Sequence, residues 1–517
     1  MTFNSQEIIQ DIRKDFENML EYVTGEQARS ATADATERGL FKQLIEMGLK
    51  LLTLFFVMRS QHASRETLKL VDGSELNYHR DTSRQYVSIF GKLCFLRPYF
   101  YRKEQKGRVP LDAELSLGED CYSDLVREVG DYLGVNGVYH KSCEILERLL
   151  GLKLSSRVLQ TNLGEDAAEV EAYYAQKPGV EASSEAEILV IQADGKGIPM
   201  ILEENQTDKD PACRDKVRLG KGEKHGRKKE AIVTSVYTIE ALIRTPAQVV
   251  ESYYDQISPS RPSRPHNKHL WATLDGKDAA LRRLSKQVQA RSGGHIQHRV
   301  ALSDGCPSLQ TRLTRYFPDY TLILDFIHAN EYLWKVANAL FGEGNEQRLG
   351  WMRARTLQLL SGQARQLIAE FRALAKQPRM RKSKRTVLLT TANYFERNLP
   401  CMDYSTYLSK GWPIASGVIE GACRHFVKDR CELSGMRWLQ SGAEHLLRLR
   451  AVAENNDWDD YHAYRKQQRH QRLYGSYQAS CDPLEAQALA PRSASLSTAP
   501  PLDPDPSSAY LQMPLAS

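Results

Sequence analysis

Three acidic side chains in this sequence stand where the fold could bring carboxylates together. Asp194 and Asp304 end apolar, β-branched stretches, "EILVIQADGKG" and "HRVALSDG", whereas Glu420 lies far along the chain in "GVIEGACRHF". Divalent cations such as Mg²⁺ prefer carboxylate oxygen and need few protein ligands. Two strand-end aspartates and a distant helical glutamate could therefore hold two metal ions, with Asp194 bridging them and Asp304 and Glu420 completing one each.

Each of these acids also has a simpler explanation. An aspartate in "ADG" or "SDG" can turn the chain through Asx-turn hydrogen bonds without any metal. If Gly417 is an N-cap, Glu420 falls in the first turn of a helix, where the helix dipole favours any carboxylate. Glu420 could equally pair with Arg424 one turn on.

Asp325 and His328 lie in "TLILDFIHANEYLW", where an apolar stretch runs into an amphipathic one. A histidine alone at such a position is more often a satisfied, partly buried group than a ligand. If the count of strands is off by one, Asp325 becomes the second metal-binding acid and Asp304 a turn residue. Both assignments remain open at this point.

An α/β domain is predicted around these residues. Strand-like stretches include residues 187–197, 231–239, 298–305 and 320–328, with a helix over 277–291. Counted along the core, Asp304 follows the fourth strand and Asp325 the fifth. Functional sites of open α/β sheets form at the carboxyl ends of strands. Residues 330–410 read as helices, and a further helix carries Glu420.

The preceding region is predicted to be mainly helical. Apolar residues recur at helical spacing up to about residue 70, and "YVSIFGKLCFLRPYFYRK" favours a β-hairpin around Gly91. "VYHKSCEILERLLGLKLSSRVLQTNL" has a break at Gly151 and an N-cap at Ser155 or Ser156, which is the outline of a helix-turn-helix. An ordinary helical hairpin is an equally open interpretation.

Composition excludes several classes of protein. The nine cysteines form no CxxC pair, which argues against a disulfide framework or a zinc ribbon and favours a reducing cytoplasm. "LLTLFFVM" (51–58) is far shorter than the roughly 20 residues of a membrane span, and the N-terminus lacks a signal-type apolar region. We therefore expect neither secretion nor a transmembrane helix.

A net charge of +6 permits binding to polyanions, and its distribution indicates where. Eight Lys and Arg residues fall in "RDKVRLGKGEKHGRKK" (214–229), between two expected strands. This stretch could bind the phosphates of a nucleic acid, or it could be a solvated loop. The residues expected to contact DNA are Lys216, Arg218, Lys221, Lys224, Arg227, Lys228, Lys229, Arg424, Lys428 and Arg430.

Several stretches resemble signatures of DDE transposases from bacterial insertion sequences, most closely the Kra family. They are "IQADGKG", "KHGRKKEAIVTSVYT", "LSDG", "LDFIHANEYLW", "LLRLRAV" and, most distinctive, "GWPIASGVIEGACRHFVKDRCELSGMRW". The resemblance covers about residues 120–465. It implies a ribonuclease-H-like core interrupted by an all-α insertion, metal-dependent cleavage of transposon ends and strand transfer into target DNA.

The resemblance also implies roles for particular residues. Asp194, Asp304 and Glu420 would be the catalytic, metal-binding triad, served by two Mg²⁺ ions for which Mn²⁺ could substitute. Related Mutator-like and hAT-like enzymes carry a Cys or Asp, two residues and then His, which Asp325 and His328 match as supporting groups. Many relatives have cysteines before "PLD" that could bind zinc, but "YRKEQKGRVPLD" has none, which puts a zinc module in doubt.

The expected fold is thus an α/β ribonuclease-H-like core with an all-α insertion, preceded by a mainly helical region. Its expected partners are double-stranded DNA and at least a second copy of the chain, in the bacterial cytoplasm near the nucleoid. A catalytically silent DNA-binding protein or repressor is the alternative. The expected parts are 1–118 (helices and hairpin), 119–180 (helix-turn-helix-like), 181–329 (core), 330–410 (insertion), 411–465 (core completion) and 466–517 (largely disordered tail).

Overall fold

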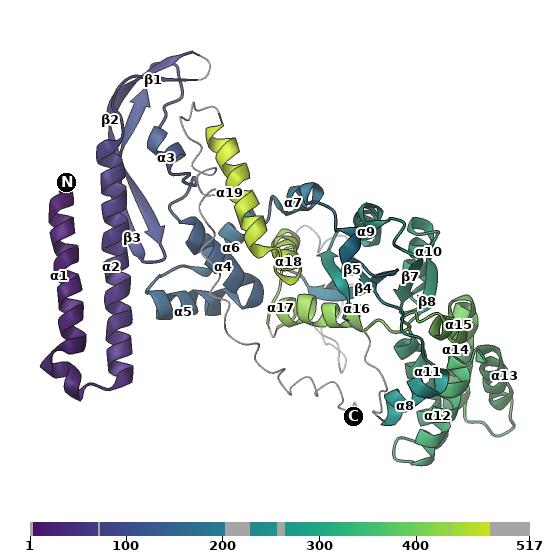
Figure 1. Cartoon of the computed structure of the whole chain (residues 1–517). Coiled ribbons are helices and arrows are strands. Elements are labelled where there is room, and N and C mark those ends of the chain that lie inside the picture. The colour runs from purple at the N-terminus through teal and green to yellow at the C-terminus, as the bar shows by residue number, and fades with distance from the viewer. Residues whose placement is uncertain (1–3, 71–72, 202–227, 256–263, 434, 476–517) are drawn as a thin grey trace, which may run out of the picture. The chain divides into compact units, whose positions relative to one another are not determined.

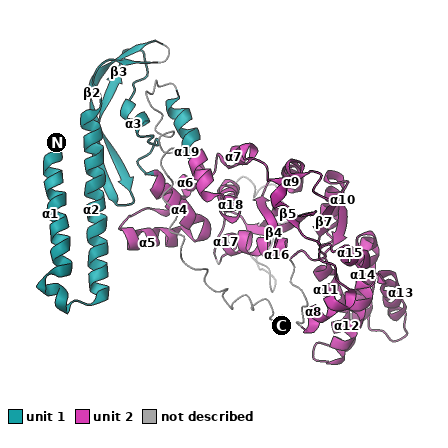
Figure 2. Cartoon of the chain, viewed as in Figure 1, with its two compact units in different colours: residues 1–123, 466–517 teal, residues 124–465 magenta. Residues whose placement is uncertain are grey.

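The computed structural model describes residues 4–70, 73–201, 228–255, 264–433 and 435–475 (Figure 1). The chain divides into two compact units, residues 1–123 with 466–517 and residues 124–465 (Figure 2). The predicted helix-turn-helix-like segment thus groups mostly with the predicted core. Across the described residues, no helix is both long and apolar enough to cross a membrane.

The smaller unit joins a helical hairpin to a small antiparallel sheet. Its sheet has the order β1-β2-β3, and Phe56 of the second long helix stacks on Phe95 of the sheet with ring centroids 4.4 Å apart. The β-hairpin predicted around Gly91 is confirmed, although its first strand begins earlier than expected. The elements are α1 (Ser5–Thr24), η1 (Glu26–Ser30), α2 (Ala33–His62), β1 (Leu68–Lys69), β2 (Glu75–Ser88), β3 (Gly91–Tyr101) and α3 (Pro110–Glu114).

The larger unit begins with four helices that include the predicted helix-turn-helix outline. Gly151 ends α5 in a left-handed conformation with φ of 69°, and the Ser155 hydroxyl caps α6 by accepting the N–H of Val158 at 3.3 Å. Both local predictions are confirmed. The helices are α4 (Asp124–Asn136), α5 (Tyr139–Leu150), α6 (Ser156–Asp166) and α7 (Val170–Gln176).

A five-stranded mixed sheet follows, so this unit is mixed α/β. The strand order is β6-β5-β4-β7-β8, in which β4, β7 and β8 run parallel while β5 and β6 are antiparallel to their neighbours. Strand β6 was not among the stretches identified from the sequence. When it is included, Asp304 follows the fourth strand of the sheet and Asp325 the fifth, as the sequence analysis predicted. The strands are β4 (Ile188–Pro199), β5 (Lys228–Ile239), β6 (His266–Thr273), β7 (His298–Ser303) and β8 (Thr321–Leu324).

Side chains of β4 alternate between the two faces of this sheet. Leu189 and Ile191 pack with α9 (Lys277–Arg291) and α10 (Pro307–Tyr316), whereas Ile188 and Val190 pack in a separate core with the helices that follow β8. Because the period of a strand is two residues, Asp194 shares the face of Ile188 and Val190. The sheet therefore turns Asp194 away from α9.

The expected all-α insertion lies between β8 and the helix of Glu420. It begins at Phe326, slightly before the expected residue 330, and its long apolar stretch 351–375 divides into two helices at Gly362, where φ is 79°. Its helices are α11 (Phe326–Phe341), α12 (Gln347–Leu360), α13 (Ala364–Ala375), α14 (Lys382–Asn398), η5 (Leu399–Cys401) and α15 (Tyr404–Ser409); α8 (Pro246–Asp255) packs against α12.

The chain then returns to the sheet through a helix that changes its winding. α16 (Gly417–Ala422) continues as a π-helical stretch, η6 (Cys423–Lys428), and ends in α17 (Asp429–Cys431). α18 (Gln440–Glu454) packs on β6. α19 (Trp458–Tyr474) shows that residues 466–474, assigned to the tail from the sequence, are helical; the expected tail beyond residue 475 lies outside the described residues.

Two hydrogen bonds hold the beginning and the end of the insertion beside the end of β8. The buried Tyr404 hydroxyl donates to the Leu324 carbonyl at 3.0 Å, and the Phe326 amide donates to the Ile414 carbonyl at 2.8 Å. Both lie beside Asp325. The first and last segments of the insertion are therefore tied to the strand end that carries this aspartate.

We expect Tyr404→Phe to lower the free energy of unfolding by about 1–3 kcal/mol, because the carbonyl of Leu324 would lose its buried partner. Urea denaturation followed by circular dichroism measures the change. Tyr253→Phe, at a side chain that is partly exposed, is the matched control and should change stability by less than about 0.5 kcal/mol. Equal effects of the two substitutions would contradict this role of the Tyr404 hydroxyl.

Candidate metal centre at the strand ends

The register of β4 and β7 places Asp194 and Asp304 level with each other. These parallel strands pair residue for residue up to Gln192 and Leu302. Continued by two residues, this register sets Asp194 beside Asp304. Neighbouring strands lie about 4.8 Å apart, so the two residues lie at the same edge of the sheet. They are near enough that the Asp304 charge contributes to raising the pKa of Asp194.

The register of β7 and β8 adds Asp325 to the same row. Ser303 pairs with Leu324, so the next residues, Asp304 and Asp325, are again level. Asp325 is fully buried and forms the N-cap of α11, where its Oδ1 accepts the N–H of Ile327 at 2.9 Å. The strand-to-helix transition seen in the sequence thus has a structural cause, because the aspartate ends the strand and caps the helix.

Glu420 reaches this edge because a buried glutamine holds the start of its helix. Gln192 of β4 accepts the N–H of Ile419 at 2.9 Å through Oε1 and donates to the Tyr237 hydroxyl at 3.1 Å through Nε2. The N-cap of α16 is Ser416, not Gly417 as expected, and Glu420 lies in the first turn as predicted. The glutamine therefore joins the Glu420 helix to the strand of Asp194.

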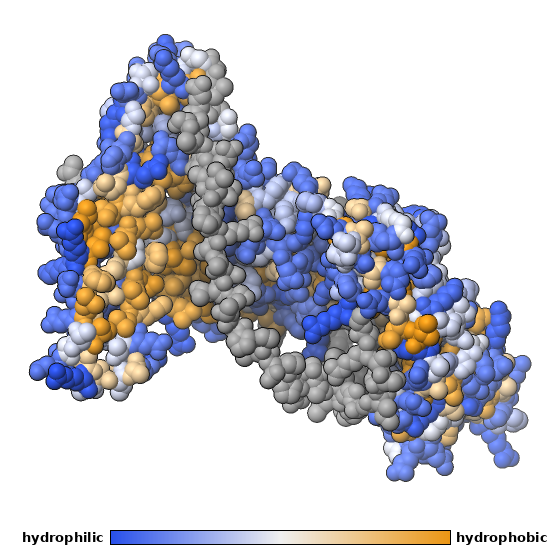
Figure 3. All heavy atoms as spheres, viewed as in Figure 1, coloured by the Kyte–Doolittle hydropathy of each residue, from blue (hydrophilic) through white to orange (hydrophobic). Residues whose placement is uncertain are grey.

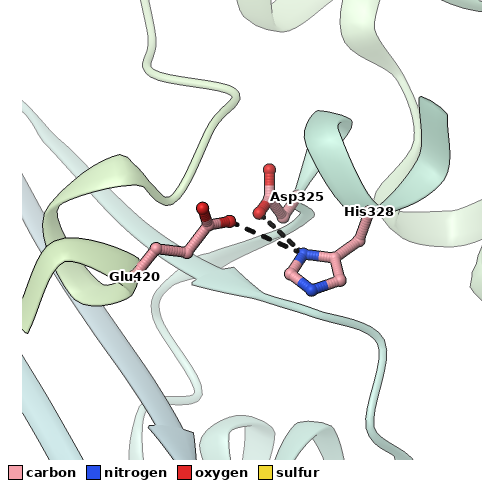
Figure 4. Close-up of side chains that lie close together, drawn as sticks. All are labelled: Asp325, His328 and Glu420. Atoms are coloured by element: carbon pink, nitrogen blue, oxygen red, sulfur yellow. Dashed lines mark hydrogen bonds and ion pairs between the residues drawn. The ribbon is translucent and has the colours of Figure 1, made fainter. Parts of the chain in front are cut away.

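Asp325, His328 and Glu420 form a compact group (Figure 4). Their ligand atoms all lie within 4.8 Å of one another, so the group could hold a metal ion. His328 Nδ1 is 2.9 Å from Asp325 Oδ2 and 3.9 Å from Glu420 Oε1. The Ser416 hydroxyl lies within hydrogen-bond distance of both carboxylates. Glu420 thus faces His328 and Ser416 rather than projecting alone from its helix.

Opposite charges within this group shift its pKa values in opposite directions. The hydrogen bond with Asp325 raises the pKa of His328 to about 9, so the imidazole is positively charged at neutral pH. Burial works against ionisation of Asp325, but hydrogen bonds from His328, Ser416 and the Ile327 amide outweigh it and lower its pKa. Burial and the charge of Asp325 raise the pKa of Glu420.

Asp194 is linked to this group through Cys423. The Cys423 thiol, buried in η6, donates to Asp194 Oδ2 at 3.3 Å, while Oδ1 accepts the Gly195 amide at 2.6 Å. Burial is the main cause of the raised pKa of Asp194, and the charge of His328 partly offsets it. The charges of Asp304 and His328 thus act on the pKa of Asp194 in opposite directions.

Asp304 occupies a well-supported turn. Its Oδ1 accepts the Cys306 amide at 2.9 Å, so the Asx-turn explanation of this residue holds. From the insertion, the Tyr394 hydroxyl donates to the Asp304 carbonyl at 2.8 Å and Arg397 donates to the Gly305 carbonyl at 2.9 Å. These bonds fix the backbone and leave the second carboxylate oxygen to other partners.

The carboxylates of this site are better ligands for a hard divalent cation than the histidine is. Of the four acids at this edge of the sheet, Asp325 and Glu420 belong with His328 to the group whose ligand atoms lie within 4.8 Å of one another, and Asp194 and Asp304 are not part of that group. Burial raises the pKa of two of the acids, Asp194 and Glu420. A cation would relieve that cost, because it favours the charged form. His328 can ligate a metal only after losing its proton. With no cation bound, His328 is thus the positive partner of Asp325.

Only some of the residues expected to contact DNA lie within the described structure. Lys216, Arg218, Lys221, Lys224 and Arg227 lie outside it. Lys228 and Lys229, at the start of β5, pair with Glu432 and Gln440, respectively. Arg424 and Lys428 are exposed on η6.

The expectation for Arg430 is wrong. Its side chain is 2% exposed, and its guanidinium donates twice to the Gly134 carbonyl, at 2.9 and 3.0 Å. The group lies over the rings of Tyr139 and Trp438. Arg430 therefore joins α4 and α5 to the Glu420 segment and is not available to DNA.

Three residues at the site were not identified from the sequence. Gln192 is a polar residue within an apolar strand, which was the one available signal, because a buried amide must have partners. Ser416 and Cys423 gave no comparable signal, since the serine contacts Asp325 across the whole insertion and the cysteine has the composition of a packing residue. A scan of known protein families and a search of curated proteins give no match to this chain.

We expect Mn²⁺ or Mg²⁺ to raise the melting temperature of the protein. A ligand at one hundred times its dissociation constant stabilises by about 2.7 kcal/mol. Glu420→Gln and Asp194→Asn should each remove most of the shift. Because the pKa values of both carboxyls are raised, protons compete with the cation and the shift should shrink as pH falls. Differential scanning fluorimetry measures it.

Asp403→Asn is the control, because Asp403 is an exposed carboxylate of the same unit that caps α15 and lies outside the candidate site. This variant should keep the full metal-induced shift. An equal shift in all four proteins would show that the cation binds elsewhere.

Proposed function

We propose that this chain is a DDE transposase that cleaves DNA at the ends of an insertion sequence and transfers the strands to target DNA. The observation that carries the proposal is the row of aspartates, Asp194, Asp304 and Asp325, with Glu420 brought against it by α16. Phosphoryl transfer by two metal ions needs such a cluster of carboxylates. The family resemblance of the stretches around these residues points to the same chemistry.

The architecture supports a ribonuclease-H-like core. Three antiparallel strands are followed by two parallel ones in the order β6-β5-β4-β7-β8, and an all-helical segment separates the fifth strand from the Glu420 helix. The resemblance implies the same arrangement, in which an all-α insertion separates the ribonuclease-H-like strands from the helix of the third catalytic acid, Glu420. A mixed sheet alone has many functions, so the proposal depends on the acids rather than on the fold.

In the proposed mechanism, the carboxylates of Asp194, Asp304 and Glu420 would hold two Mg²⁺ ions. When bound, the ions activate a water or a 3′-hydroxyl and stabilise the leaving oxygen. Asp325 holds the charged imidazole of His328 at 2.9 Å, where its positive charge can attract a phosphate of the flanking strand. Ser416 keeps the two carboxylates in place. No covalent enzyme intermediate is required.

Asp304 remains our choice over Asp325 as the second acid. Asp325 is fully buried, and its oxygens already accept hydrogen bonds from His328, Ser416 and the Ile327 amide. Asp304 is partly exposed and level with Asp194. Asp325 fits better as a structural anchor of the insertion.

We expect Asp194→Asn and Asp304→Asn to reduce cleavage at least about 1,000-fold, because each removes a carboxylate that stabilises charge in the transition state. The substrate is a duplex that carries the genomic DNA flanking the coding region, incubated with Mg²⁺ and analysed on denaturing gels. Chelation by EDTA should abolish cleavage. Joined products distinguish a transposase from a nuclease that only hydrolyses.

Asp278→Asn is the matched control, since Asp278 is an exposed carboxylate of the same unit that pairs with Arg312. It should leave cleavage unchanged. Full activity of Asp194→Asn would remove the proposed active site. Activity lost in Asp325→Asn but retained in Asp304→Asn would make Asp325 the second acid.

We also expect Arg424→Ala combined with Lys428→Ala to weaken DNA binding and its salt dependence. Both side chains are exposed on η6, the stretch that follows the Glu420 helix. Each lost phosphate contact lowers the slope of log affinity against log salt by about 0.9. Fluorescence anisotropy with a labelled duplex between about 50 and 200 mM NaCl gives the slope. Arg365→Ala with Lys376→Ala, in the insertion, is the control and should retain the slope of the unmodified protein.

A further inference from the structure

The helical hairpin of the smaller unit carries a continuous apolar surface. Eight large apolar side chains of α1 and α2 are between 36% and 53% exposed. Figure 3 shows apolar side chains gathered over these two helices. We call this surface the hairpin face; its residues are Phe16, Leu20, Val23, Phe41, Leu44, Leu51, Phe55 and Met58.

The two helices form one defined element. The Tyr22 hydroxyl of α1 donates to the Ala35 carbonyl of α2 at 3.0 Å, and Lys50 pairs with Asp15 at 2.6 Å. Gly39 allows the close approach, because a Cβ there would lie 2.1 Å from the Tyr22 hydroxyl oxygen. The face is therefore presented by a hairpin whose helices are joined at both its turn and its middle.

The core of the smaller unit uses a different side of α2. Phe56 and Val57 are buried, and Phe56 packs against Phe95 and Tyr86 of the β-hairpin. The exposed residues of the hairpin face thus remain outside that core. In α1, no residue is buried. The apolar side of α1 is therefore covered only in part by α2, and a partner on this side would stabilise the helix further.

The spacing of the exposed residues on α2 is that of a helix that packs against other helices. Positions 41, 44, 51, 55 and 58 are separated by three, seven, four and three residues. Gly48, which would divide the step of seven, faces Phe90 of the β-hairpin instead. The five exposed positions fit the a and d pattern of a heptad, which forms a seam along one side of a helix. The pattern predicts a helical partner rather than a strand or a small molecule.

The charges of the two helices indicate which helical partner. α1 carries five acidic and two basic residues, whereas α2 carries three acidic and four basic residues, His62 aside. Glu17 and Glu21 follow apolar positions of α1, and Arg38 and Lys42 are exposed on α2. A second hairpin of the same kind therefore meets this one favourably when α1 of each faces α2 of the other.

We propose that the hairpin face is a dimerisation surface that binds the hairpin of a second copy of this chain. A two-fold axis makes the pairing of α1 with α2 occur twice and buries both apolar sides in a four-helix arrangement. Pairing of α1 with α1 would instead bring two acidic helices together. The inference does not rest on the proposed enzymatic function, because none of the candidate metal-binding residues belongs to this unit.

The test is the mass of the full-length protein in solution, measured by light scattering coupled to size-exclusion chromatography over a concentration series. Unmodified protein should have twice the 58.7 kDa of one chain. Leu44→Glu, Leu51→Glu and Phe55→Glu together should raise the dissociation constant at least about 100-fold and yield the mass of one chain. Phe16→Ser with Leu20→Ser should also weaken the dimer, because α1 forms half of the surface.

The matched control is Ile243→Glu, Leu357→Glu and Leu389→Glu, at exposed apolar residues of the larger unit. It should remain a dimer. Circular dichroism identifies folded variants, and the serine pair decides the question if the glutamate triple variant does not fold.

A single-chain mass for the unmodified protein overturns the proposal. A different partner, or the chain's own terminal segment on this face, would produce that mass. A dimer that persists in both hairpin variants also overturns the proposal. Loss of DNA cleavage without a change in mass would bear on the proposed function alone.

Discussion

The residue-for-residue alignment of three parallel strands is the constraint on which the candidate site depends. Gln192 of β4 is level with Leu302 of β7, and the same kind of pairing continues into β8. A shift of one residue in any of these strands would turn its aspartate to the opposite face of the sheet. A shift of β4 would also turn Gln192 away from the Tyr237 hydroxyl and the Ile419 amide, which are its buried partners.

The fourth acid depends on the same strand by a different route. Glu420 comes from a helix that the chain reaches only after the whole insertion, yet Gln192 binds the first turn of that helix. One strand thus carries Asp194 and also positions Glu420. The π-helical stretch that follows turns the Cys423 thiol toward Asp194, and such extra residues in a helix often occur at functional sites.

The sequence predicted the parts of this fold in which local pattern and burial agree. The strands of Asp194, Asp304 and Asp325, the hairpin at Gly91 and the cap at Ser155 all belong to this group. Strand β6 was missed because its first half is polar, "HNKH", and only its second half is buried. Glu420 could be placed in a first helical turn, but its neighbour His328 comes from the other end of the insertion, so their approach depends on how the insertion folds.

Arg430 shows the limit of reading charge from a sequence. It stands among exposed basic residues near the Glu420 helix, so its surroundings in the chain favour a surface position. Two aromatic rings and a helix carbonyl, all from other elements, enclose its guanidinium instead. A cation is buried only where several distant groups share its hydrogen bonds and its charge, and no local pattern reports such an enclosure.

The way the insertion is attached suggests where the protein can be altered without disturbing its acids. The hydrogen bonds described above between the insertion and the strand ends come from Ile327, His328, Tyr394, Arg397 and Tyr404. The far end of α11 lies 16 residues beyond Asp325, a distance of about 24 Å at the rise of an α-helix. The loop after it, residues 342–346, is rich in glycine and is a suitable place to graft a fluorescent reporter or an affinity tag.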